Sequence, residues 1–91
     1  MNRILEKTER FLEDAARGKV DTHAISWFAT SALSGSNIPL NSDLGYELST
    51  LANMALGPEH MLDRYQLVLT LHRLKYWADA KRISDQERAA G

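Results

Sequence analysis

Residues 58–80 read PEHMLDRYQLVLTLHRLKYWADA and form the longest and most apolar helical segment that the sequence predicts. On a helix that turns about 100° per residue, this segment carries two apolar stripes. The first stripe consists of Leu62, Tyr65, Val68, Leu69, His72 and Tyr76, and the second of Leu67, Leu71, Leu74 and Ala78. A surface helix of a small domain needs one apolar stripe, so a helix with two has to be covered from two sides.

Three shorter helices are predicted before this segment, because apolar residues recur every three or four positions and no segment alternates as a strand would. Gly18 supplies a stop for the first helix, and Asn41 or Ser42 can cap the third. Gly57 and Pro58 end the third helix and start the fourth. The sequence therefore predicts an all-α compact bundle of four helices, with approximate bounds 2–17, 22–34, 42–56 and 58–80.

The chain of 91 residues is predicted to form a single domain, 1–91, with a polar tail over residues 81–91 that either extends the last helix or frays. It contains no cysteine, so neither disulfides nor a cysteine-based zinc site can supplement a small core. Self-association is the remaining common source of stability. The sequence shows no secretory signal and no membrane span, which indicates a cytoplasmic protein.

A homodimer is expected because three short helices can cover only one stripe of the last helix comfortably. The other stripe would then meet a second copy of the chain or another protein. The candidate dimer contacts are Leu67, Leu71, Leu74 and Ala78. If His72 is buried at such an interface, its protonation would weaken association at low pH.

Residues 22–42, THAISWFATSALSGSNIPLNS, contain no charged side chain, although a quarter of the whole chain is charged. Ile25, Phe28 and Ala29 share the predicted core face of this helix, and Trp27 points to the opposite side. Uncharged surroundings and an exposed tryptophan are typical of the centre of a protein interface. The residues predicted as a partner interface are His23, Trp27, Thr30, Ser31 and Ser34. Two alternatives stay open: another helix of the same chain covers Trp27, or the indole is incidentally exposed.

Catalytic, metal-binding and cofactor-binding motifs are not apparent in the sequence. His60, Glu59 and Asp63 could approach one another over a helical turn, but no pair of histidines converges as zinc ligands do. Glu59 is more simply a charge that favours the start of a helix. The prediction is therefore a protein without enzymatic activity, metal or cofactor.

Nucleic-acid binding is the main competing function. The net charge of the chain is −1, and the third helix carries no basic residue to read DNA bases. The densest basic surface consists of Arg64, Arg73, Lys75, Lys81 and Arg82, and acidic residues dilute it.

The sequence thus favours a non-enzymatic protein–protein interaction module that acts through an apolar helical surface. In size and composition the chain is similar to small anti-activators and inhibitors, which work by covering a partner's surface. A regulatory or inhibitory role is therefore predicted. A small helical DNA-binding regulator and a structural subunit of a larger assembly are the alternatives.

Overall fold

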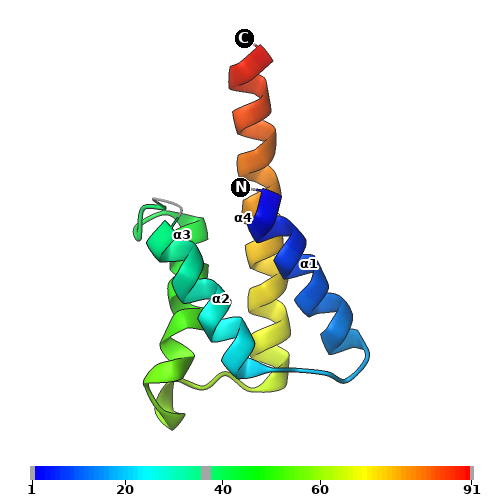
Figure 1. Ribbon diagram of the computed structural model, residues 1–91, viewed down its shortest axis with the longest axis vertical. Coiled ribbons are helices and arrows are strands. Elements are labelled where there is room, and N and C mark those ends of the chain that lie inside the picture. Colours follow the sequence, from blue (N-terminus) through cyan, green and yellow to red (C-terminus); the bar gives the residue numbers. More distant parts are fainter. Residues whose placement is uncertain (1, 36–37, 91) are drawn as a thin grey trace.

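The longest helix, α4 (Arg64–Ala90), runs the length of the molecule, and its C-terminal part projects beyond the other helices (Figure 1). The computed structural model describes residues 2–35 and 38–90, and side chains within 3–35 and 38–81. Within this part the predicted all-α bundle of four helices is confirmed. The elements are α1 (Asn2–Ala16), α2 (Thr22–Gly35), α3 (Asp43–Ala52), the short 3-10 helices η1 (Asn53–Leu56) and η2 (Pro58–His60), and α4.

The four helices pack as two pairs. α1 lies against α4, α2 lies against α3, and the contact between α3 and α4 joins the two pairs. The core contains mainly aliphatic side chains, including Ile4, Ile25, Leu44, Leu48, Leu51, Leu67, Leu71 and Leu74. α1 and α2 are thus held mainly by different helices of the bundle.

The start of the last helix differs from the prediction at Pro58. Residues Pro58–His60 form only a 3-10 turn, and Met61 has extended backbone with φ −73° and ψ 133°. Asp63 then caps α4, since its Oδ1 accepts a hydrogen bond of 2.8 Å from the backbone N–H of Gln66. α4 therefore begins later than predicted, because the aspartate that caps it lies five residues after the proline.

The end of the last helix lies beyond residue 80. Of the two possibilities for the tail, fraying or extension, the structure has the backbone helical through Ala90. The third helix is shorter than predicted, because α3 ends at Ala52 and continues as the 3-10 turn η1.

Two arginines of α4 tie it to its neighbours. The Arg73 Nε donates to Oε1 of the buried Glu47 on α3 at 2.9 Å, and a guanidinium N–H of Arg64 donates to the backbone carbonyl of Ala15 at 3.0 Å. The second contact satisfies a carbonyl at the C-terminal end of α1, where a cation is also favoured by the helix dipole. Arg73 therefore ties α4 to α3, and Arg64 ties α4 to the end of α1.

Candidate protein-binding groove

The face of α2 that carries no charge is exposed. All five residues predicted as a partner interface lie on it: His23, Trp27, Thr30, Ser31 and Ser34. The Trp27 side chain is 70% exposed, so no helix of this chain covers it. The lack of charge in this helix is therefore not explained by burial on both sides.

The opposite face of α2 explains why Trp27 points outward. Ile25, Ala29 and Ala32 are buried against the rest of the bundle, and the Ser26 hydroxyl donates to the Ala52 carbonyl at 3.0 Å. On a helix that turns about 100° per residue, Trp27 lies roughly opposite Ile25, Ala29 and Ala32, which takes it out of the contact with α3. Packing of α2 on α3 thus fixes the exposure of the tryptophan.

A groove of about 920 Å³ runs between α1 and α2. Its apolar lining includes Ile4, Phe11 and Phe28, and the two phenylalanine rings contact each other with centroids 5.5 Å apart. Trp27 and Ser31 belong to the α2 wall. We call this feature the α1–α2 groove; among the described residues its lining is Arg3, Ile4, Glu6, Lys7, Arg10, Phe11, Ala24, Trp27, Phe28, Ser31, Ala32 and Gly35.

The two walls of the α1–α2 groove differ in charge. The α1 wall carries three basic residues, Arg3, Lys7 and Arg10, and one acidic residue, Glu6. The α2 wall contributes no charged residue to the lining. The groove therefore combines an aromatic floor with one basic edge and one neutral edge.

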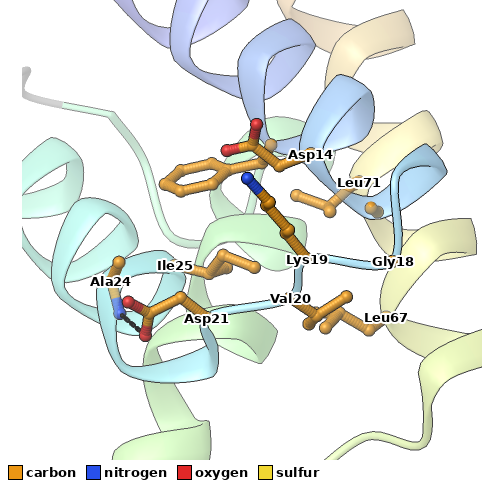
Figure 2. Close-up of a pocket in the computed structure, with 11 residues that line it drawn as sticks. Asp14, Gly18, Lys19, Val20, Asp21, Ala24, Ile25, Leu67 and Leu71 are labelled. Atoms are coloured by element: carbon orange, nitrogen blue, oxygen red, sulfur yellow. Dashed lines mark hydrogen bonds between the residues drawn. The ribbon is translucent and has the colours of Figure 1, made fainter.

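A smaller cavity of about 470 Å³ continues the groove toward the turn that joins α1 to α2 (Figure 2). It shares Phe11 and Ala24 with the groove, and Leu67 and Leu71 of α4 line it. In Figure 2 the Lys19 side chain extends toward Asp14. Asp21 caps α2, because its Oδ1 accepts a hydrogen bond of 3.0 Å from the backbone N–H of Ala24. At this end the charges are thus mixed rather than basic.

The four residues predicted as candidate dimer contacts lie in the core of the single chain. Leu71, Leu74 and Ala78 are 0% exposed and Leu67 is 1% exposed. The prediction is corrected at this point, because α1 and α3 pack against α4 and this stripe is buried in the core of the single chain.

The other stripe of α4 remains partly uncovered. Four of its residues are exposed, among them Tyr65 at 77% and Tyr76 at 65%; we call this set the outer stripe, Tyr65, Leu69, His72 and Tyr76. Val68 and Leu62 are half-buried. The stripe that stays partly exposed is therefore not the one that was predicted to form the dimer contacts.

The described side chains contain no group of three residues placed to hold a metal ion. Glu59 and His60 form an exposed pair with 3.7 Å between Oε1 and Nε2, while Asp63 caps α4. Of the predicted basic surface, Arg64 and Arg73 are engaged within the chain, and the side chain of Arg82 lies outside the described residues. Over the part of the chain that the structure describes, no helix is long and apolar enough to cross a membrane.

The sequence analysis predicted an exposed face around Trp27 but did not predict the wall opposite it. Phe11 lies on the apolar side of its helix and Arg10 on the charged side, and the sequence does not indicate that both line a groove with α2. The partner of a helix face depends on the tertiary arrangement, and the periodicity of α1 alone cannot show it.

The sequence matches no protein-family model, and we found no similar curated protein or solved structure. The function is therefore argued from the groove and the outer stripe themselves.

Proposed function

We propose that this chain is a non-enzymatic protein-binding module, a small regulatory or inhibitory protein that holds a partner protein in the α1–α2 groove. The observation that carries the proposal is Trp27, which is 70% exposed on a helix face without charge at the edge of an aromatic groove. Tryptophan is enriched among residues that dominate binding energy, and charged residues are depleted at interface centres.

The composition of the groove lining supports a helix as the bound segment. A partner helix that lays its apolar side into a hydrophobic groove needs an elongated apolar floor with polar edges. Ile4, Phe11 and Phe28 provide such a floor, and α1 and α2 provide the edges. Trp27 lies where it can fold over a bound helix.

The two alternative functions are a DNA-binding regulator and a structural subunit. A DNA-binding regulator would use the exposed bases of α4 and α1, but Arg73 and Arg64 are already engaged in contacts within the chain. A structural subunit would use the same apolar surfaces as the proposed module and would differ in being permanently bound.

Truncating Trp27 separates binding from stability. Because the side chain is mostly exposed, Trp27→Ala is expected to change the free energy of unfolding by less than about 1 kcal/mol, while it weakens partner binding by about 2 kcal/mol or more. Thermal melts measure the first quantity. Pull-downs from lysate of the source cells, at low and high salt, identify proteins retained by the wild type and lost by the variant.

Tyr46→Ala is the matched control, since Tyr46 is 64% exposed on α3 and does not line the groove. It is expected to retain the same proteins as the wild type. Equal retention by Trp27→Ala would contradict the proposal. Recovery of nucleic acid at low salt that vanishes at high salt would favour the DNA-binding alternative.

We further propose a homodimer through the outer stripe of α4. Tyr65, Leu69, His72 and Tyr76 are separated by four, three and four residues, which is the spacing with which two helices pack side chains into each other's gaps. A C2 dimer would bring two copies of the stripe together on the side of α4 away from the core.

A charge in the outer stripe is expected to prevent this dimer. Leu69 is 41% exposed, so Leu69→Glu should leave the fold intact and convert the dimer to the 10.3 kDa monomer in sedimentation equilibrium at micromolar concentration. Gln66→Glu is the control, because it introduces the same charge on the same helix outside the stripe. A wild-type chain that stays at 10.3 kDa at high concentration would contradict the dimer.

A further inference from the structure

We infer that the α1–α2 groove selects an amphipathic helix of a partner protein whose apolar side is bordered by acidic residues. This inference rests on the proposed function and adds to it the chemistry of the partner.

The charge of the groove carries the inference. Of the four charged residues in its lining, Arg3, Lys7 and Arg10 are basic and only Glu6 is acidic. They all belong to α1, so the positive charge lies along one edge. A bound helix with carboxylates along that edge would gain opposite-charge contacts, and one with lysines there would be repelled.

The dimensions of the groove set the length of the partner segment. α2 has 14 residues, which corresponds to about 21 Å at 1.5 Å per residue. The basic edge from Arg3 to Arg10 covers about two helical turns of that length. A partner helix of about four turns, with acidic residues beside its apolar side over two of them, therefore matches the groove.

A second copy of the chain does not offer this combination. The outer stripe is the exposed apolar stripe of α4. Of the two bases that flank it, Arg73 is paired with Glu47 and Lys75 is exposed. Placing the outer stripe in the groove would set Lys75 against the basic edge. The electrostatics therefore favour a different protein with an acidic helix.

Two designed 14-residue amphipathic helical peptides test the inference. They share one apolar stripe and differ only in the border residues, which are glutamates in one and lysines in the other. Fluorescence anisotropy at low salt is expected to give at least tenfold tighter binding of the glutamate peptide, with the difference shrinking as salt increases. Trp27→Ala should weaken the binding of that peptide.

Reversing the basic edge provides the decisive variant. Lys7→Glu combined with Arg10→Glu changes two residues with exposed side chains and is expected to reverse the preference toward the lysine peptide. A gain of lysine-peptide binding cannot arise from unfolding. Arg17→Glu, one residue after the end of α1 and outside the groove lining, should keep the original preference.

The outcomes separate the two claims. Equal binding of both peptides in a Trp27-dependent manner would overturn the acidic preference and leave the protein-binding groove intact. Binding of neither peptide to the wild type would contradict the groove as a helix-binding site and the inference with it. Self-association that depends on Trp27 would assign the groove to a second copy and would also overturn the inference.

Discussion

Replacing Leu71 by arginine is expected to unfold the chain. Leu71 is 0% exposed within the core, so the arginine would have to place a charge among aliphatic side chains. A domain of this size has a stability of about 5 to 14 kcal/mol, and an unpaired buried charge removes several kcal/mol together with the lost leucine packing. Far-UV circular dichroism and a urea titration should show no cooperative folded state at 25 °C.

Leu69→Arg is the matched control for this experiment. It makes the same substitution two residues earlier on α4, at a side chain that is 41% exposed. This variant is expected to fold with nearly wild-type stability. Burial of Leu71 makes an unfolded chain, and not a folded monomer, the expected result for Leu71→Arg. A cooperatively folded Leu71→Arg monomer would show that this stripe is not part of the core.

Replacing Gly45 by alanine is expected to cost about 2 to 3 kcal/mol of stability. A Cβ at this position would lie 2.0 Å from the backbone carbonyl oxygen of Pro39, which is far inside van der Waals contact. The same carbonyl accepts a hydrogen bond from the hydroxyl of Ser42, and Ser42 caps α3 by accepting from the N–H of Gly45. The loop would have to move away and loosen this cap, which outweighs the roughly 1 kcal/mol by which alanine favours a helix over glycine.

Gly35→Ala provides the comparison for Gly45→Ala. A Cβ at Gly35, the last residue of α2, would have no atom within 4 Å, so the substitution should be close to neutral. Urea denaturation of the two variants measures the difference. A Gly45→Ala protein that is as stable as Gly35→Ala would mean that the loop at Pro39 is not held against α3.

The candidate site was only partly open to prediction. The absence of charge in residues 22–42 and the position of Trp27 outside the core face of its helix indicated an interface residue, and the structure places this side chain at 70% exposure. Whether another helix covered it could not be derived, because that depends on where α1 lies. The basic edge of the groove was missed for the same reason: Lys7 and Arg10 had no visible relation to Trp27 until the helices were placed in space.

The sequence by itself determined the all-α architecture, because apolar residues recur with the helical period and glycine and proline punctuate the chain near the helix ends. It also determined that the last helix carries two apolar stripes and that one of them would be left over, since the number of short helices limits how much surface they can cover. Only the tertiary structure decided which stripe that is. Leu67, Leu71 and Leu74 are buried in the core, where α1 and α3 pack against α4, whereas Tyr65 and Tyr76 are exposed. Both stripes are apolar and helically spaced, so local periodicity cannot rank them. The choice follows from how well each stripe packs against α1 and α3 at once, which is a property of long-range contacts.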